Sequence, residues 1–306
     1  MKTAYLFSGQ GAQYEGMARD LYANSPVIKD FYDEANDTLG FKLLELSAED
    51  LADTKYAQLA TLCHSLALWI ALDLDVNDGV HLAGFSLGEY SSYGAAKLLD
   101  YTELLKLVQK RAEFMAEDST KNPAAMFAVL NLDDEIIEKH LADNYAGKVY
   151  PVNYNSPGQL VISGLENETI QVADELVELG ARRAVRLNTS GAFHTPFMHE
   201  ASLKLADYAK DFKWNNTEAH LYGNYSGEKF TETDLANMPE YLSKHMVSPV
   251  RWKETVINMY DEGVRRFIEL GPGKTLSGLV KRTLRQNKDI EIINIDSFAD
   301  LENYLS

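Results

Sequence analysis

The pentapeptide Gly84-Phe85-Ser86-Leu87-Gly88 constrains the fold of this chain more than any other stretch. A short apolar run over residues 80–83 leads into it, and residues 89–91 begin a helix-like pattern. Glycine on both sides of the serine lets the backbone turn sharply from a strand into a helix, because glycine has no Cβ to clash. The Ser86 hydroxyl would then project from the turn, and the N–H of Leu87 would lie unpaired at the start of the helix. An ordinary strand-to-helix turn has the same pattern, so a nucleophile and a structural turn both remain open.

Composition places the chain among ordinary globular proteins. Its 306 residues are 45% hydrophobic and 25% charged, enough for one large domain or for a large domain and a small one. The single cysteine, Cys63, excludes an internal disulfide and stands in an apolar helical run that predicts burial. No signal peptide opens the chain and no apolar run is long enough to span a bilayer, so we expect a cytoplasmic protein. The formal net charge of −17 argues against nucleic acid and anionic membranes as partners.

Strand-like and helix-like segments alternate along the chain and predict an α/β fold. We expect a hydrolase-like large domain, residues 1–121 and 189–306, with a central, mostly parallel sheet. Asp100 is a candidate N-cap between two of its helices. Between 122 and 188 the order is strand, helix, strand, strand, helix, strand, which predicts an inserted ferredoxin-like small domain.

Two glycine-rich loops imitate nucleotide-binding motifs without completing them. In the loop over residues 8–13, Tyr14 stands where a dinucleotide fingerprint needs its third glycine. In the loop over residues 271–275, Ile268 stands where a P-loop needs its first glycine. We therefore expect no nucleotide, no other cofactor and no metal. The first loop could instead offer backbone N–H groups to an oxyanion.

A nucleophilic Ser86 would need a base, and the chain has seven histidines. His194 stands in a loop between small residues just before a helix, where its side chain can point into a cleft. His199 is the rival, although its place on the following helix favours exposure to solvent. A structural role is expected for three others, which stand in the apolar helix, in the strand before the pentapeptide and in the small domain: His64, His81 and His140.

Five short motifs occur in an order and spacing that resemble one known family. They are Ser8-Gly9-Gln10-Gly11-Ala12-Gln13, Gly84-Phe85-Ser86-Leu87-Gly88-Glu89-Tyr90, Asn155-Ser156-Pro157-Gly158-Gln159, Gly191-Ala192-Phe193-His194 and Gly271-Pro272-Gly273. The chain resembles the malonyl-CoA:acyl-carrier-protein transacylases of bacterial fatty-acid synthesis, which are similar to the acyltransferase domains of polyketide synthases. The resemblance covers essentially the whole chain, including the inserted small domain.

The resemblance implies a role for each matching position. Ser86 would carry the malonyl group as an ester, and His194 would be its base. The backbone N–H groups of Gln10 and Leu87 would form the oxyanion hole. The backbone carbonyl of Arg251 would orient the histidine, so that the identity of the Arg251 side chain should matter little.

Substrate choice follows from two further positions. Arg111 matches the arginine that pairs with the malonyl carboxylate, and a guanidinium can hold a carboxylate with two charge-assisted hydrogen bonds. Phe193 would crowd an α-methyl branch, which favours malonyl over methylmalonyl. The sequence departs from the family at Ser8, where proline is usual, and at Phe85, where histidine is usual; we expect altered packing or tuning and no loss of activity.

The implied reaction is ping-pong transfer of malonyl from malonyl-CoA to the phosphopantetheine thiol of acyl carrier protein, supplying fatty-acid synthesis, with malonyl-CoA as substrate and no cofactor. We expect a monomer. Because the carrier protein is itself acidic, docking should use a local basic patch. The candidate is the C-terminal cluster of Lys274, Lys281, Arg282 and Arg285, and the stretch Arg182-Arg183-Ala184-Val185-Arg186 is the other dense basic segment.

Three alternatives stay open. The first is a polyketide-pathway acyltransferase, which would share the same site. The second is a serine thioester hydrolase of the α/β-hydrolase kind, which would release free malonate and leave the carrier protein unacylated. The third is a non-catalytic docking module of a larger synthase, which would never form an acyl-serine ester.

Overall fold

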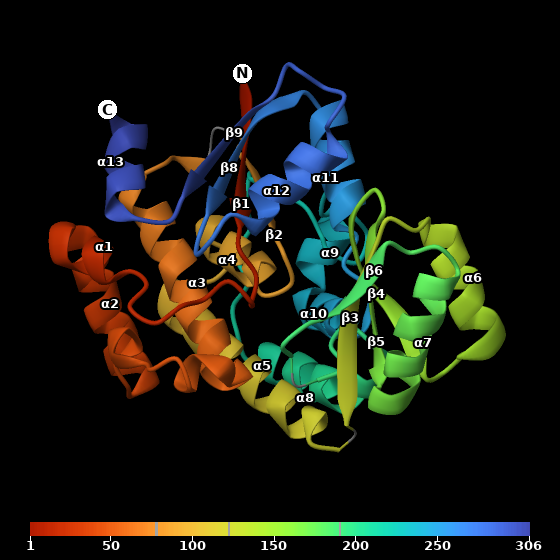
Figure 1. Cartoon of the computed structure of the whole chain (residues 1–306). Coiled ribbons are helices and arrows are strands. Elements are labelled where there is room, and N and C mark those ends of the chain that lie inside the picture. The colour runs from red at the N-terminus through yellow and green to blue at the C-terminus, as the bar shows by residue number, and fades with distance from the viewer. Residues whose placement is uncertain (77–78, 122, 190) are drawn as a thin grey trace.

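The computed structural model describes residues 1–76, 79–121, 123–189 and 191–306, and it contains two separate sheets (Figure 1). The larger sheet has the order β7-β2-β1-β8-β9, and all four neighbouring pairs are parallel. Its strands are β1 (Lys2–Phe7), β2 (His81–Gly84), β7 (His220–Leu221), β8 (Val264–Leu270) and β9 (Glu291–Ile295). The predicted central parallel sheet is confirmed. Only β7 had no sequence signal, because two residues are too few to show a strand pattern.

Helices cover both faces of this sheet, α1 to α3 on one side and α11 and α12 on the other (Figure 1). Within the large domain the α-helices are α1 (Arg19–Asn24), α2 (Pro26–Leu39), α3 (Thr54–Ala71), α4 (Gly88–Ala95), α5 (Tyr101–Ser119), α8 (His199–Ala209), α9 (Glu232–Ala236), α10 (Met238–Val247), α11 (Trp252–Asp261), α12 (Thr275–Thr283) and α13 (Phe298–Leu305). Short 3-10 turns are η1 (Leu43–Glu45), η2 (Asp50–Ala52) and η4 (Pro196–Met198). Asp100 caps α5 as predicted, since its carboxylate accepts from the Glu103 N–H at 2.7 Å.

Strand β1 shows why the sheet is covered on both sides. Its side chains alternate between two cores, as the two-residue period of a strand requires. Tyr5 and Phe7 point toward α3. Their rings lie edge-on to that of Trp69, and the distances between ring centres are 5.3 Å for Tyr5 and 6.0 Å for Phe7. Ala4 and Leu6 point to the core beneath α11 and α12. A strand that is apolar on both faces belongs in the middle of a parallel sheet.

The second sheet is antiparallel and has the order β4-β5-β3-β6. Its elements are β3 (Ala124–Leu130), α6 (Asp134–Asn144), β4 (Val149–Ser156), β5 (Gln159–Leu165), α7 (Glu166–Glu178) and β6 (Arg183–Arg186). Their connectivity is the predicted ferredoxin-like order, and they enclose a separate hydrophobic core. The boundaries at 122 and 188 stay a prediction, and residue 122 lies outside the described residues.

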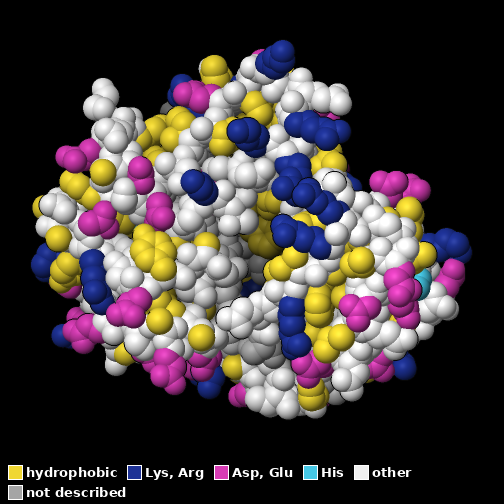
Figure 2. Space-filling model, in the orientation of Figure 1, with side chains coloured by type: hydrophobic (Ala, Val, Ile, Leu, Met, Phe, Trp, Pro, Cys, Tyr) yellow, Lys and Arg dark blue, Asp and Glu magenta, His cyan; other side chains and the backbone are white. Residues whose placement is uncertain are grey.

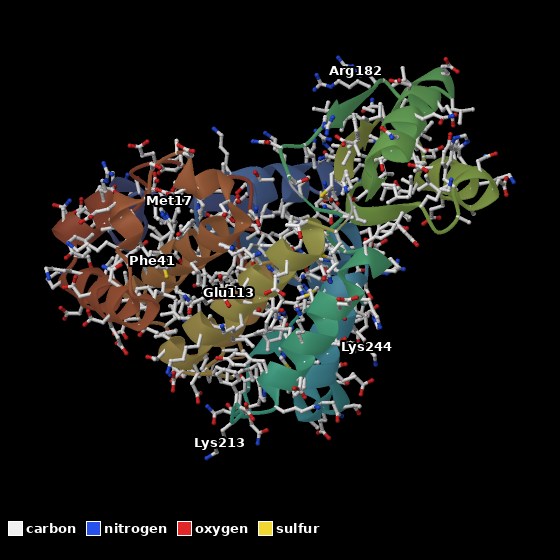
Figure 3. The ribbon with its side chains drawn as sticks, turned by 90° about the horizontal axis from the view of Figure 1, so that it is seen from below. Met17, Phe41, Glu113, Arg182, Lys213 and Lys244 are labelled. Carbon is white, nitrogen blue, oxygen red and sulfur yellow. The ribbon has the colours of Figure 1, made fainter. Side chains whose placement is uncertain are left out.

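The small sheet stands to one side of the large domain (Figure 3), with Arg182 at its outer margin and Met17 and Phe41 at the far end of the molecule. Backbone hydrogen bonds join the two units: Val250 donates to Val152 at 2.8 Å and accepts from Tyr154 at 2.8 Å. The cleft between the small sheet and the loops and helices of the large domain is the hollow in the centre of Figure 2. Among the residues that the structure describes, none of the helices combines the length and apolar composition needed to cross a bilayer.

Candidate active site

Ser86 lies at the turn between β2 and α4, as the pentapeptide predicts. Its φ of 51° puts it in the left-handed region, which is uncommon for a residue with a Cβ. A Cβ on Gly84 would overlap the backbone of Gly88, and a Cβ on Gly88 would overlap the carbonyl of Phe7. Only glycine fits at either position, so these two residues fix the sharp turn that presents the Ser86 hydroxyl.

His194 approaches Ser86 from the loop before η4. The Ser86 Oγ and the His194 Nε2 are 2.7 Å apart. On the other side of the ring, Nδ1 lies 3.1 Å from the carbonyl oxygen of Ser248 and 3.3 Å from that of His245. Because a carbonyl can only accept, the Nδ1 carries the hydrogen and Nε2 is free to accept the proton of the serine hydroxyl.

Burial keeps this imidazole neutral. The side chain is only 4% exposed, and this burial together with the charge of Arg111 lowers the pKa of His194 to about 4. The hydrogen bonds to the carbonyls of His245 and Ser248 raise the pKa of His194, but their effect is smaller than that of burial and Arg111. At neutral pH the ring is therefore in the form that can take up a proton.

The prediction that the backbone carbonyl of Arg251 orients His194 is wrong. Its carbonyl oxygen accepts from the backbone N–H and the hydroxyl of Thr255, both at 3.0 Å, because Arg251 is the N-cap of α11 and its carbonyl begins that helix. The carbonyls that contact His194 belong to His245 and Ser248, at the end of α10. The last carbonyls of a helix have no partner within it and are free to accept from outside.

Gln10 and Leu87, the two predicted oxyanion donors, line the same cleft as Ser86. Gln10 belongs to the glycine-rich loop after β1, and Leu87 is the N-cap of α4. A Cβ on Gly9 would press into the carbonyl of Phe85, so this loop lies directly against the serine turn. Neither the Gln10 N–H nor the Leu87 N–H makes a hydrogen bond within the described part of the chain. Both donors are available to an oxyanion formed at Ser86.

Arg111 reaches the cleft from α5. It is 1% exposed, its Nη1 donates to the Gln58 Oε1, and its guanidinium lies over the ring of Tyr90, 4.9 Å from the ring centre. Its Nε and Nη2 have no partner among the described residues. A buried cation with two unpaired donors is costly unless a ligand pairs them, and a carboxylate fits such a fork.

The cleft that holds these groups has a volume of about 540 Å³. Strands of the small sheet line one side of it, and loops and helices of the large domain line the rest. The structure places in it all five groups that the sequence predicts around the reaction, namely Ser86, His194, Gln10, Leu87 and Arg111. An apolar wall adjoins them, formed by Met115, Met126, Ala128, Val161 and Phe193. Arg251 is not among the lining residues.

The family described as acyl transferase domain matches residues 4–296. The chain belongs to the acyl transferase family. It is similar to the malonyl CoA-acyl carrier protein transacylase of Bacillus subtilis strain 168, with 39% identity over 95% of this chain and 93% of that protein. The fold is similar to that of the crystal structure of MCAT from Streptococcus pneumoniae, with 36% identity, a TM-score of 0.90 and coverage of 99% of both chains. It is also similar to a malonyl-transacylase in complex with a type II polyketide-synthase acyl carrier protein, with 32% identity, a TM-score of 0.92, and coverage of 100% of this chain and 99% of that one.

The two positions expected to differ from the family, Phe85 and Ser8, make contacts of their own. The Phe85 ring lies edge-on to Trp252, with ring centres 5.6 Å apart. The Ser8 hydroxyl lies 3.4 Å from the carboxylate of Glu269, which also accepts from two backbone N–H groups at the start of α12. Neither side chain reaches the Ser86–His194 pair by any hydrogen bond in the described chain.

Four other histidines, named below, do not line the cleft of the acyltransferase. His199 is exposed, as predicted. His64 contacts the backbone carbonyl of Asp296 at 2.8 Å, His81 the hydroxyl of Tyr222 at 3.0 Å, and His140 the carboxylate of Glu175 at 2.7 Å. Among the residues described, no group of three or more His, Cys, Asp and Glu side chains is arranged to hold a metal ion.

Sequence reasoning missed four residues that support the site: Gln58, Glu89, Asn224 and His245. Glu89 belongs to the motif around Ser86, and this was the only available signal. Gln58 and His245 lie in helices whose other residues show an ordinary apolar pattern. Asn224 lies in a loop after β7, 138 residues from Ser86, and nothing local marks it.

Proposed function

We propose that this acyltransferase moves the malonyl group from malonyl-CoA to the phosphopantetheine thiol of an acyl carrier protein. One observation carries the proposal: the 2.7 Å Ser86–His194 contact and the unpaired donors of Arg111 share one cleft. A nucleophile and base serve many acyl transfers, but a buried guanidinium beside them selects an acyl group that carries its own carboxylate. Relatives over nearly the whole chain are named malonyl CoA-acyl carrier protein transacylases.

In the first half-reaction His194 Nε2 takes the proton of the Ser86 hydroxyl as Oγ attacks the thioester carbonyl. The oxygen of the tetrahedral intermediate accepts from the N–H groups of Gln10 and Leu87, and each such donor contributes roughly 2.7–4 kcal/mol. The carbon–sulfur bond then breaks, and His194 returns the proton to the sulfur of coenzyme A. The malonyl group remains on Ser86 as an ester.

The second half-reaction runs the same steps in reverse with another thiol. His194 takes the proton of the phosphopantetheine thiol, sulfur attacks the ester carbonyl, and the proton returns to the Ser86 Oγ as the ester breaks. A positioned base contributes about 10²–10⁴-fold to such steps. Carbonyls of Ser248 and His245 do for the imidazole what an aspartate does in a serine triad: they fix its tautomer.

Substrate choice depends on two sides of the acyl pocket. Arg111 would hold the malonyl carboxylate through Nε and Nη2, which acetyl cannot use. Phe193 is next to His194, is largely buried and lines the cleft. Its ring would narrow the space beside the acyl α-carbon. We propose malonyl over both acetyl and methylmalonyl for these separate reasons.

The basic C-terminal cluster is the proposed docking surface for the acidic carrier protein. Lys274, Lys281, Arg282 and Arg285 are exposed on and around α12, and within the described chain none of them forms a salt bridge. Lys and Arg side chains gather over α12 and beside the hollow that leads to the cleft (Figure 2). Arg282 donates to Gln159 of β5 at 2.6 Å, which connects this surface to the small sheet.

A charge reversal with a matched control tests the docking surface. Lys281→Glu should raise the KM for carrier protein and leave malonyl loading from malonyl-CoA unchanged. Lys213→Glu reverses the same type of charge at an exposed site away from α12 (Figure 3) and should change neither. Equal loss of both half-reactions in Lys281→Glu would remove the surface from consideration.

Mass spectrometry after mixing with malonyl-CoA tests the reaction itself. We expect a malonyl adduct on Ser86 that disappears when holo acyl carrier protein is added, and no adduct with Ser86→Ala. Free malonate without acylated carrier protein would favour the thioester hydrolase. The failure to form any ester would favour a docking module. Carrier proteins from fatty-acid and polyketide systems, compared as acceptors, separate the two pathways.

We also propose that the enzyme works as a monomer, because Ser86, His194, Gln10, Leu87 and Arg111 all line one cleft of a single chain. Sedimentation at assay concentrations measures this directly. A dimer whose dissociation abolishes activity would contradict it.

A further inference from the structure

The backbone of the Ser86 turn is held by a single side chain from a distant loop. The Ser86 N–H donates to the Asn224 Oδ1 at 2.6 Å, and the Asn224 Nδ2 donates to the carbonyl oxygen of Gly84 at 2.7 Å. The Asn224 amide therefore clamps the residue before the turn and the residue at its apex. Asn224 is 1% exposed and follows β7, which pairs with the strand that leads into the turn.

This clamp acts where the backbone needs support. Ser86 has a left-handed φ, which residues with a Cβ avoid unless the surrounding structure enforces it. The Ser86 N–H donates to Asn224, and without that side chain it would have no partner in the described part of the chain. Relaxation of the turn would move the Ser86 Oγ away from the His194 Nε2, since only one rotatable bond joins the Oγ to the backbone and only two join the Nε2 to it.

Asn224 is fixed in turn by a buried carboxylate. Its backbone N–H donates to the Glu89 Oε2 at 2.6 Å, and the Tyr93 hydroxyl donates to the Glu89 Oε1 at 2.5 Å. Glu89 is fully buried in the first turn of α4, one residue after Gly88. The chain from Ser86 to Glu89 and the bonds from Glu89 through Asn224 back to Ser86 thus form a closed ring around the turn.

The same carboxylate also lies beside the support of the base. The Glu89 Oε2 is 3.7 Å from the His245 Nε2, and both side chains are fully buried. The ring of His245 lies edge-on to that of His194, with centres 5.6 Å apart, and the carbonyl of His245 contacts the His194 Nδ1. The buried polar cluster of Glu89, Asn224 and His245 therefore contacts both the Ser86 turn and the His194 ring.

We propose that Asn224 is a positioning residue that sets the direction of the Ser86 hydroxyl toward His194, and that Glu89 holds Asn224 in place. This inference rests on the proposed function for its natural substrate. The geometry it describes should nevertheless control the reactivity of Ser86 toward any acylating or phosphonylating reagent.

Two readouts test the inference separately from the substrate. The first is the rate constant for labelling of Ser86 by an uncharged fluorophosphonate, which needs no carboxylate site. The second is the rate constant of malonyl-Ser86 formation per competent site, with competent sites counted from the burst of released coenzyme A. For Asn224→Ala we expect both rate constants to fall about 10²-fold, the effect of a misplacement of about 1 Å. Malonyl-CoA should bind equally well to Ser86→Ala and to Ser86→Ala/Asn224→Ala.

Asn258→Ala is the matched control. The Asn258 side chain also holds a loop, because its Nδ2 donates a hydrogen bond to the carbonyl of Gly227 at 2.9 Å. It makes no hydrogen bond to the Ser86 turn in the described chain. We expect its rate constants to be those of the wild type, whatever its thermal stability. Glu89→Gln keeps the shape of the side chain and should lower the Ser86 rate constants less than Asn224→Ala does. It serves as the second variant if Asn224→Ala does not fold.

The inference would be overturned if the rate constants per competent site were unchanged in Asn224→Ala, or in Glu89→Gln if only that variant folds. Asn224 would then have a purely structural role. If malonyl-CoA never acylates the wild type but fluorophosphonate labelling still depends on Asn224, the proposed function fails and the positioning role stands.

Discussion

Replacing Arg111 by alanine should separate malonyl transfer from acetyl transfer. The structure gives the size of the effect. The guanidinium offers two unpaired donors, Nε and Nη2, in a site that is 1% exposed. A hydrogen bond to a charged group contributes about 1.5–3 kcal/mol, so losing two costs about 3–6 kcal/mol. At 1.36 kcal/mol per factor of ten, the kcat/KM for malonyl-CoA should fall about 10²- to 10⁴-fold.

The acetyl group has no carboxylate, so its kcat/KM should change little in the same variant. The assay is transfer of each acyl group from coenzyme A to holo acyl carrier protein, and the measured quantity is the ratio of the two kcat/KM values. Arg111→Lys keeps the charge but not the planar fork, so its ratio should fall between the wild type and Arg111→Ala.

A fold check accompanies these variants because Arg111→Ala also leaves the Gln58 Oε1 without its donor. Thermal unfolding and the yield of fluorophosphonate-labelled Ser86 report whether the site remains assembled. An equal loss of malonyl and acetyl transfer with an intact site would refute the carboxylate clamp.

Three other predictions concern the turn, the base and the acyl pocket. The kcat/KM for malonyl-CoA should be constant between pH 6 and 8 and decline only toward pH 4. The pKa of His194 is lowered to about 4, so the Nε2 stays unprotonated above that pH. A decline in kcat/KM centred near pH 6.5 would contradict this prediction. Gly84→Ala should destabilise the protein by about 1–3 kcal/mol in urea unfolding because its Cβ overlaps the Gly88 backbone, whereas Gly278→Ala, in an open helical position, should stabilise it by about 0.5–1 kcal/mol. Phe193→Ala should shift the methylmalonyl-to-malonyl ratio of kcat/KM upward by about 10- to 200-fold, the range for one methyl group in a pocket, and no shift would exclude Phe193 as the wall.

The local geometry around Ser86 could be predicted from the sequence because its causes are local. Two glycines on either side of a serine, between an apolar run and a helix, allow one sharp turn, and the structure contains it. The ferredoxin-like order between 122 and 188 was also predictable, since hydrophobic periodicity and turn residues mark each element in turn.

The support of the site could not be predicted in the same way. Arg251 was expected to orient His194, but the carbonyls that do so belong to Ser248 and His245. Which carbonyl is free depends on where α10 ends and where α11 begins, and helix ends are the least certain part of a sequence prediction. Ser248 lies three residues before Arg251 and His245 six, so the position of a helix end decides which carbonyl faces the imidazole.

The sequence by itself determined an α/β chain with a glycine-framed serine, a histidine in a later loop and an arginine in a helix between them. Tertiary structure alone decided that these side chains meet, that Arg111 keeps two donors unpaired and that Asn224 holds the Ser86 turn. Short-range order follows from the sterics of neighbouring residues, which the sequence records directly. Contacts between residues more than a hundred positions apart depend on how strands and helices pack, and no local pattern contains that information.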